Sequence, residues 1–310
     1  MSLALWSAID RQCRSRLRSR AYLVGATLPV LLISALLYQT AVATKSPATA
    51  MFLGILSALW IGGSSCVREI VDERRLVERE PHLNLVAYGL AKIVHAVTLA
   101  SLQAGIVTLF LSLTGVVRLS FPDLWLIIAL VTVAGSLLAM ILSALCNEAS
   151  TALAWFPLLL VPQVVFGGFL FPYGTTRPFD LNRATHVVTV MPQPLIRPKV
   201  TNLALRAAGA LCVSRWALEA YAAEVFEQDL DDDERLEEAV LVSFFMPLTL
   251  IERQPSDQLL DYLTESPGAE RPTLRIAARR WAYRAILAGF ALAEALLLLV
   301  LLPYRDPRRL

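Results

Sequence analysis

The sequence predicts an all-α polytopic membrane protein with six transmembrane helices, and three observations lead to this fold class. The chain of 310 residues is 56% hydrophobic and 17% charged, with a mean hydropathy of +0.57, which is too apolar for a soluble domain of this length. Six long stretches are almost free of charge. Basic residues gather in the short segments that flank these stretches on one side of the membrane.

Each stretch reaches the length of about 20 apolar residues that a helix needs to cross the hydrocarbon core. The stretches are residues 21–44, 46–67, 93–117, 124–147, 149–176 and 285–304. The first could be a signal peptide, because it ends in Ala41-Val42-Ala43, which resembles a cleavage site. Its apolar part is longer than the usual signal core of about 7–15 residues, so we interpret it as a retained helix.

The charge of the short flanking segments predicts that both termini are cytoplasmic. Five arginines lie in the leader of residues 1–20, four in the link 68–79 and three in the tail 305–310, whereas the short links on the other side have one basic residue each. The leader itself is predicted to be an amphipathic interfacial helix, with a disordered basic tail as the alternative.

This topology divides the remainder of the chain. Residues 21–176 hold the first five spans and, at 68–81, a charged cytoplasmic segment. Residues 177–280 form an extracytoplasmic loop region between spans five and six, which we expect to be partly helical because residues 203–226 have helical periodicity. Residues 281–310 hold the sixth span and a cytoplasmic tail.

The charged segment 68–81 is predicted to be a helix. Four basic and five acidic residues are interleaved along it, good helix formers occupy most positions, and Pro81 provides a stop. Arg74 and Glu78 are spaced so that they can pair along one face. Such a helix is stable in water and too charged to enter lipid. By composition alone, a solvated connector is the simpler interpretation.

Three sets of residues, in a consistent order along the chain, resemble a known family. The first set is Arg68-Glu69-Ile70, Glu73-Arg74, Arg79-Glu80, Asn84-Leu85, Tyr88 and Lys92. The second is the glycine-rich segment Phe166-Gly167-Gly168-Phe169-Leu170-Phe171-Pro172. The third is Ser214-Arg215-Trp216-Ala217-Leu218-Glu219-Ala220. Together with six spans, these sets resemble the permeases of ABC-2 type exporters, in particular the class that contains the G subfamily.

The resemblance implies that residues 68–81 are a coupling helix, which docks on an ATP-binding subunit and passes its movement to spans two and three. The candidate contacts to that subunit are Glu69, Glu73, Arg74, Arg79 and Glu80. The resemblance also implies a dimer, with a second copy or with a related permease, and a separate ABC subunit that holds ATP and Mg. No G-x-x-x-x-G-K-[ST] loop occurs in these 310 residues, so we expect no cofactor and no catalytic site on this chain.

Three polar residues inside predicted spans are candidates for a transport pathway or for helix packing. Glu294 is a carboxylate within span six, where insertion costs about 2.5–3.5 kcal/mol, so it is expected to face the bundle interior or to be protonated. It could contact cargo or a proton, or form a structural hydrogen bond. Gln103 and Gln163 raise the same question, and hydrogen bonding between helices is the better interpretation for both.

The expected function is therefore the permease of an ATP-driven exporter for an amphipathic or lipid-like cargo. Two alternatives remain: an ATP-independent channel or proton-coupled carrier that uses Glu294, and a membrane anchor or assembly factor. A net charge of +2 does not suggest nucleic acid, and neither the histidines nor the cysteines have metal-binding spacing. Short loops and the lack of glycosylation sequons favour a multi-pass protein of the plasma membrane, specifically a bacterial inner membrane.

Overall fold

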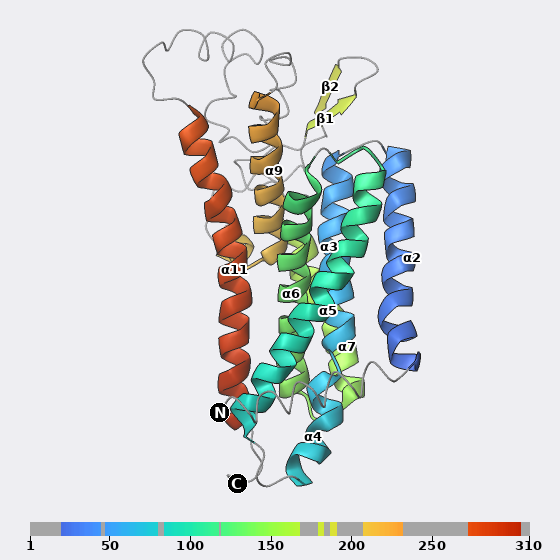
Figure 1. The fold of residues 1–310 in the computed structure, drawn as a ribbon, viewed down its shortest axis with the longest axis vertical. Coiled ribbons are helices and arrows are strands. Elements are labelled where there is room, and N and C mark those ends of the chain that lie inside the picture. The colour runs from blue at the N-terminus through green and yellow to red at the C-terminus, as the bar shows by residue number, and fades with distance from the viewer. Residues whose placement is uncertain are drawn as a thin grey trace.

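The computed structural model is a bundle of long helices (Figure 1). It describes residues 20–44, 47–79, 84–117, 119–167, 179–182, 187–190, 207–231 and 272–304. The helices are α2 (Arg20–Thr44), α3 (Pro47–Cys66), α4 (Glu69–Arg79), α5 (Leu85–Leu113), α6 (Phe121–Leu145), α7 (Ala149–Val165), α9 (Val213–Asp231) and α11 (Pro272–Tyr304). We call the end of the bundle where α4 lies the α4 end, and the opposite end, toward which α9 lies, the α9 end.

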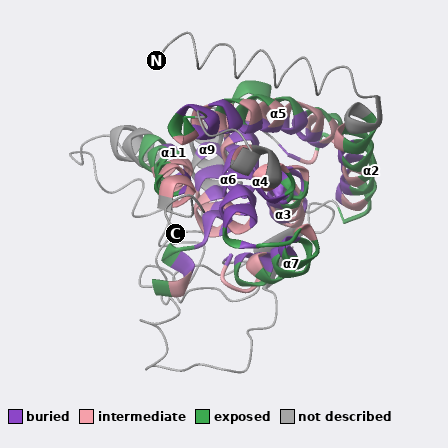
Figure 2. Ribbon diagram, turned by 90° about the horizontal axis from the view of Figure 1, so that it is seen from below, coloured by how far each residue is buried: buried purple, intermediate pink, exposed green. Residues whose placement is uncertain are grey.

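Helix α6 lies at the centre of the bundle, and its sequence explains this position. After Asp123 it carries no charge, and its buried side chains point in every direction around the helix. A helix that is apolar all round has to be enclosed by other helices. It packs against α3, α4, α5, α7, α9 and α11. Figure 2, a view from the α4 end, shows α6 and α3 buried in the middle, with the exposed sides of α2, α5, α7 and α11 around them.

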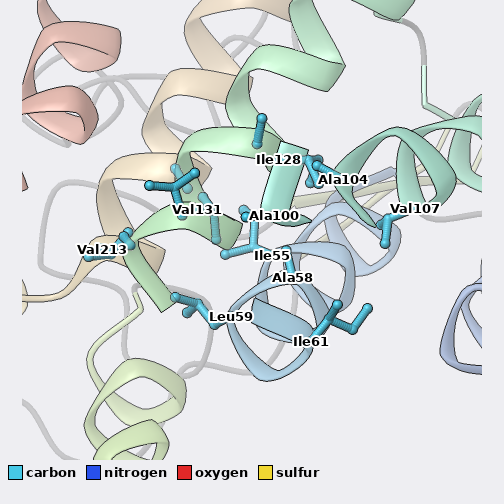
Figure 3. Packing of buried hydrophobic residues seen from close by; sticks show 14 of the residues in the cluster. Ile55, Ala58, Leu59, Ile61, Ala100, Ala104, Val107, Ile128, Val131 and Val213 are labelled. Atoms are coloured by element: carbon cyan, nitrogen blue, oxygen red, sulfur yellow. The ribbon is translucent and has the colours of Figure 1, made fainter. Parts of the chain in front are cut away.

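The backbones of α3 and α6 approach each other closely, because glycines lie in the contact. A Cβ atom on Gly62 would lie 2.1 Å from the carbonyl oxygen of Thr132, and one on Gly135 would lie 2.6 Å from that of Leu59. Small residues of this kind allow close packing of helices in membranes, where contact between helices is driven by packing. Aliphatic side chains fill the space around this contact, as Figure 3 shows for Ile55, Ala58, Leu59, Ile61, Ala100, Ala104, Val107, Ile128, Val131 and Val213.

Three predicted spans, 21–44, 46–67 and 124–147, correspond closely to α2, α3 and α6. Helix α5 differs, because it begins at Leu85 and not at the predicted residue 93. Asn84 caps it, since its side-chain oxygen accepts hydrogen bonds from the N–H groups of Val86 and Ala87 at 3.0 and 3.2 Å. The charge of Lys92, which suggested a later start, is compensated by contacts with α4, so the helix continues through it.

The predicted fifth span, 149–176, corresponds to the shorter helix α7 in the described residues. Helix α7 has 17 residues, and the N–H of Phe166 donates to the carbonyl oxygen of Pro162 where it ends. In the part of the chain that the structure describes, five helical stretches are long and apolar enough to cross a membrane: Val24–Thr44, Thr49–Arg74, Leu85–Leu113, Phe121–Leu145 and Trp281–Pro303. The count of six spans and the cytoplasmic placement of the termini stay predictions.

The predicted loop region 177–280 is not wholly helical where it is described. Strands β1 (Phe179–Asn182) and β2 (Val187–Val190) form an antiparallel pair that the sequence analysis did not predict. Helix α9 covers most of the predicted helical part, and α11 begins at Pro272, inside the predicted loop. The predicted interfacial helix lies outside the described residues, apart from Arg20.

Candidate functional site

Helix α4 is the charged helix that the sequence predicted, with bounds Glu69–Arg79 in place of 68–81. Its first turn contains the acidic residues Glu69 and Asp72, whose negative charges are favourable at the positive N-terminal end of the helix dipole. The side chains of Glu69, Ile70 and Val71 are buried against the bundle, whereas those of Arg68 and Asp72 are exposed. One side of α4 is therefore attached to the chain's own helices.

A buried cluster of charges joins α4 to α5. The ammonium group of Lys92 lies 2.5 Å from Glu69 Oε2 and 2.6 Å from Glu73 Oε1, and the Lys92 side chain is only 1% exposed. The hydroxyl of Tyr88 donates to Glu73 Oε2 at 3.0 Å. His95 Nε2 lies 4.0 Å from the other oxygen of Glu69. A lysine is hardly ever fully buried unless it is paired, so both carboxylates are needed to keep Lys92 in this position.

The spacing of these residues along α5 follows from helix geometry. Residues three or four positions apart lie on one face of a helix, so Tyr88, Lys92 and His95 all face α4. The cap at Asn84 fixes where α5 begins, one turn before Tyr88. This arrangement places the first turns of α5 alongside α4.

A second set of contacts joins α4 to α6 by reciprocal capping. The first N–H groups of a helix have no partner within the helix. In α4, the N–H groups of Ile70 and Val71 donate to the hydroxyl oxygen of Ser143 in α6, at 3.2 and 3.1 Å. Ser143 therefore serves as a cap for α4, although it is far away in the sequence.

In return, Arg74 of α4 caps the C-terminal end of α6. Its Nη2 donates to the carbonyl oxygen of Ala144 at 2.9 Å, and its Nη1 donates to Asn147 Oδ1 at 2.9 Å. Carbonyl groups in the last turn of a helix lack internal partners, and a cation is favourable at this negative end of the dipole. Helices α4 and α6 thus satisfy each other's free backbone groups.

The structure brings three of the five predicted coupling residues together, and it places them toward the bundle. Glu69 and Glu73 bind Lys92, and Arg74 binds the end of α6. Whether any of them contacts a second subunit stays a prediction. Arg79 is the last residue of α4, but its side chain lies outside the described part, as does Glu80.

Sequence reasoning did not single out Lys92, Tyr88, Ser143 or Asn147 as site residues. Tyr88 and Lys92 had a detectable signal, because a tyrosine and a lysine four residues apart precede an apolar stretch and follow a segment rich in carboxylates. Ser143 had none, since a serine in an apolar helix is common and its partner is backbone.

The two predicted polar glutamines both join helices. Gln103 Nε2 donates to Ser65 Oγ at 2.9 Å and to the carbonyl oxygen of Ala26 at 3.2 Å, which links α5 to α3 and α2. Gln163 Oε1 accepts from the N–H of Ser214 at 3.1 Å, and its carbonyl oxygen accepts from Ser214 Oγ at 2.6 Å. These contacts attach the start of α9 to the end of α7.

Glu294 lies in α11 on the same face as the buried residues Leu287 and Leu298. Its Oε2 atom is enclosed and has no hydrogen-bond partner among the described residues. Within the described ranges this oxygen therefore makes no hydrogen bond to a neighbouring helix, and both proposed roles of Glu294 stay predictions. Within the described ranges, no group of three His, Cys, Asp or Glu side chains could hold a metal ion, and Cys66, Cys146 and Cys212 are buried free thiols.

The fold and this site define a polytopic helical membrane protein in which an amphipathic helix at one end of the bundle is fixed to two membrane helices. A family model described as ABC-2 type transporter matches residues 4–187, which is more than half of the chain. The chain therefore belongs to the ABC-2 type transporter family, whose membrane domain is a permease that works with ATP-binding subunits.

The chain is also similar to the ABC transporter ATP-binding/permease protein Rv1747 of Mycobacterium tuberculosis. The two are 29% identical over 148 residues, a match that covers 44% of this chain. The match covers 17% of the relative, so it extends over about a sixth of that protein's length.

Proposed function

We propose that this chain is the permease of an ABC exporter and that α4 is its coupling helix. The observation that carries the proposal is the attachment of α4. Its inner side is fixed to α5 by Lys92 and to α6 by Ser143 and Arg74, while Arg68 and Asp72 are exposed on the other side. A helix attached in this way can receive a push on one side and pass it to the membrane helices on the other.

The contacts favour transmission to spans three and four as well as span two. Helix α4 follows α3 in the chain, its carboxylates bind Lys92 of α5, and its backbone is capped by Ser143 of α6. Because α6 packs closely on α3, a displacement of α4 would move these helices together as a rigid body.

The docking surface for the ATP-binding subunit would be the exposed side of α4. Asp72 is exposed, and positions 75 and 79 follow it at helical spacing, three and seven residues on. Arg75 and Arg79 occupy these positions in the sequence, so the register aligns one acidic residue with two basic ones. Of the predicted contact residues, Arg79 fits this surface by register, whereas Glu73 and Arg74 fit the role of transmission.

The rest of the proposed assembly is an ATPase and a second permease. The 310 residues contain no phosphate loop, which supports an ATPase outside them, and we propose a separate polypeptide. Apolar side chains such as Leu36, Trp155 and Leu296 are exposed on α2, α7 and α11, and they suit lipid or a second permease. A homodimer or heterodimer would enclose a path for an amphipathic or lipid-like cargo across a bacterial inner membrane.

The test is purification of the tagged chain from its native membrane in mild detergent, with mass spectrometry of the proteins that accompany it. We expect an ATPase with a phosphate loop. Two double variants separate docking from transmission. Arg68→Glu with Asp72→Arg reverses charges on the exposed side and should remove the ATPase. Glu73→Gln with Arg74→Gln alters the inner side and should retain it.

The result is informative only for folded variants, so both are compared with the parent chain by size-exclusion chromatography in the same detergent. If the parent chain retains no ATPase even after cross-linking, the exporter function is wrong. If the inner-side variant loses the ATPase and the outer-side variant keeps it, the exporter function survives but the docking surface is misplaced.

A further inference from the structure

A second cluster of charges lies away from α4 and joins three helices at the α9 end. Its centre is Arg284 of α11. Arg284 Nη2 donates to Asp123 Oδ1 in the first turn of α6 at 2.6 Å, and it forms an ion pair with Glu224 Oε1 of α9 at 2.5 Å. The Glu224 side chain is 1% exposed and that of Arg284 is 8% exposed. We call these three residues the Arg284 cluster.

The cluster holds α9 against both neighbours at once. One guanidinium group faces two carboxylates from different helices, and the ring of Trp281 lies 5.2 Å from the guanidinium carbon. The negative charge of Asp123 also suits the N-terminal end of α6, where Ser120 is the cap. Asp123 is 29% exposed, so the contact that water cannot replace is the one between Arg284 and Glu224. Removing either of these two charges leaves the other buried without its partner, so they are expected to act as a unit.

The start of α9 is held by a different kind of contact. Ser214 binds Gln163 through two hydrogen bonds, and the buried thiol of Cys212 lies 3.5 Å from the carbonyl oxygen of Pro162. Ten residues separate Ser214 from Glu224, a rise of about 15 Å along a helix. Helix α9 therefore has two attachments, a neutral one to α7 and an ionic one to α6 and α11.

Within the described part of the chain, the ionic attachment is incompletely satisfied, which suits a contact that opens. The Nε atom of Arg284 is enclosed and has no hydrogen-bond partner among the described residues. A buried polar group of this kind reduces the net stabilisation that the cluster supplies. A contact that only stabilises the fold is strongest when every donor is paired. A contact that has to open needs a small free-energy difference between its closed and open states.

We propose that Arg284 is a positioning residue that seats α9 against α6 and α11 through Glu224 and Asp123, and that this cluster separates when the α9 end opens to release cargo. The second part rests on the proposed exporter function. The first part concerns the chain alone. Neither part involves the coupling site, which lies at the opposite end of the bundle.

The buried thiol of Cys212 provides a reporter for the seating of α9. The experiment uses the full chain in membrane vesicles, with Cys13, Cys66 and Cys146 replaced by alanine, and measures the rate at which a membrane-impermeant thiol reagent labels Cys212. Arg284→Gln should raise the rate about tenfold, the change that corresponds to an opening easier by about 1.4 kcal/mol. Arg284→Lys should restore most of the protection, because it keeps the charge.

Glu148→Gln is the control. It removes an exposed carboxylate at the α4 end, where Ser150 donates to it, and Glu148 lies away from α9, so the labelling rate should stay at the parent value. Arg284→Gln with Glu224→Gln should label no faster than Arg284→Gln alone, because the two residues act as a unit.

An unchanged rate in folded Arg284→Gln, or independent effects of the two substitutions, would overturn the seating role. If Arg284→Gln does not fold, Glu224→Gln replaces it as the test, since it leaves Arg284 bound to Asp123. A Cys212 labelling rate several times higher than in the parent chain supports the proposal, and an unchanged rate overturns it. Addition of the ATPase and ATP should speed labelling in the parent chain. If it does not, while the variants still label faster, the exporter function is in doubt and the seating role stands.

Discussion

At the scale of single residues, the side chain of Lys92 compensates two carboxylates and thereby decides how α4 is attached. Glu69 is 4% exposed and Glu73 is 27% exposed, so the contact with Glu69 is the one that water cannot replace. A buried pair does not by itself stabilise a protein much relative to apolar residues, but loss of one partner is costly. The pair therefore fixes geometry more than it adds stability.

The first prediction concerns this pair. Lys92→Met should destabilise the chain by about 3–5 kcal/mol, because it leaves the carboxylate of Glu69 buried without its cation. Adding Glu69→Gln should recover a large part of the loss. Thermal unfolding in detergent measures both. Arg68→Met, which removes an exposed cation next to α4, serves as the control and should change stability by about 0.5 kcal/mol or less. A double variant as unstable as the single one would contradict this account.

The second prediction concerns Glu294. Under the exporter function, ATP supplies the energy, so Glu294→Gln should keep ATP-driven activity within about threefold in proteoliposomes that contain the ATPase. A proton-coupled carrier needs an ionisable group, so the same variant would abolish its activity. Gln103→Leu provides the comparison, since it removes the two hydrogen bonds that link α5 to α3 and α2 and should lower stability without a change in the energy source.

The site could be predicted from sequence only up to the type of each residue. The charges of α4 indicated a helix outside lipid. Glu69, Glu73 and Arg74 were predicted as contacts to an ATP-binding subunit, and that role stays a prediction. Their orientation could not be predicted, because the partners Lys92 and Ser143 belong to other helices. A run of mixed charges also does not indicate which face of the helix packs against the bundle.

At the scale of elements, the glycines of α3 and α6 determine how the core packs. Gly62 faces the backbone of Thr132 and Gly135 faces that of Leu59, so the two backbones approach each other closely over one helical turn. A close contact of backbones is stiff, since no side chain can yield. Under the proposed function, this stiffness would let α3 and α6 move together.

The third prediction tests this contact. Gly135→Ala should lower stability by about 1–3 kcal/mol, because its Cβ would lie 2.6 Å from the carbonyl oxygen of Leu59 and the helices would have to separate. Gly289→Ala is the control, since a Cβ there meets nothing within 4 Å, and it should be neutral or slightly stabilising. Thermal unfolding measures the stability of both variants. An equal loss of stability in the two would show that the contact between α3 and α6 is not stiff.

The ends of the helices were predicted well where charged residues flank them, and poorly where a capping residue sets the end. Helices α2, α3 and α6 lie between charged residues that the sequence displays. Helix α5 begins at Leu85, after the cap Asn84, whereas the predicted boundary was Lys92 because an intramembrane lysine is costly. The partners that remove this cost lie in α4. The strand pair β1–β2 was missed, because two strands of four residues have too little periodicity to detect.

At the scale of the whole molecule, the two charge clusters lie at opposite ends of one bundle. The cluster at Lys92 joins α4 to α5, the cluster at Arg284 joins α9 to α6 and α11, and α6 takes part at both ends through Ser143 and Asp123. A helix that is central, apolar and fixed at both ends can carry a displacement over its whole length. Helix α6 is therefore the element through which the two ends are expected to communicate.

The fourth prediction tests this communication. Ser143→Ala with Arg74→Gln removes the reciprocal caps between α4 and α6 and leaves the ion pairs of Lys92 in place. In the complex with the ATPase, ATP hydrolysis should continue, because docking uses the exposed side of α4. The ATP-dependent increase in labelling of Cys212, which lies just before α9, should fall by about tenfold, since α6 no longer follows α4.

The control for the fourth prediction is Ser150→Ala, which removes a hydroxyl that bonds only to Glu148 among the described contacts, also at the α4 end. It should leave both hydrolysis and labelling at the parent values. If the caps are removed and labelling still responds fully to ATP, then α6 does not connect the two ends, and transmission through α5 and its Lys92 contacts is the route. If hydrolysis stops as well, α4 has lost its shape and docking depends on the caps.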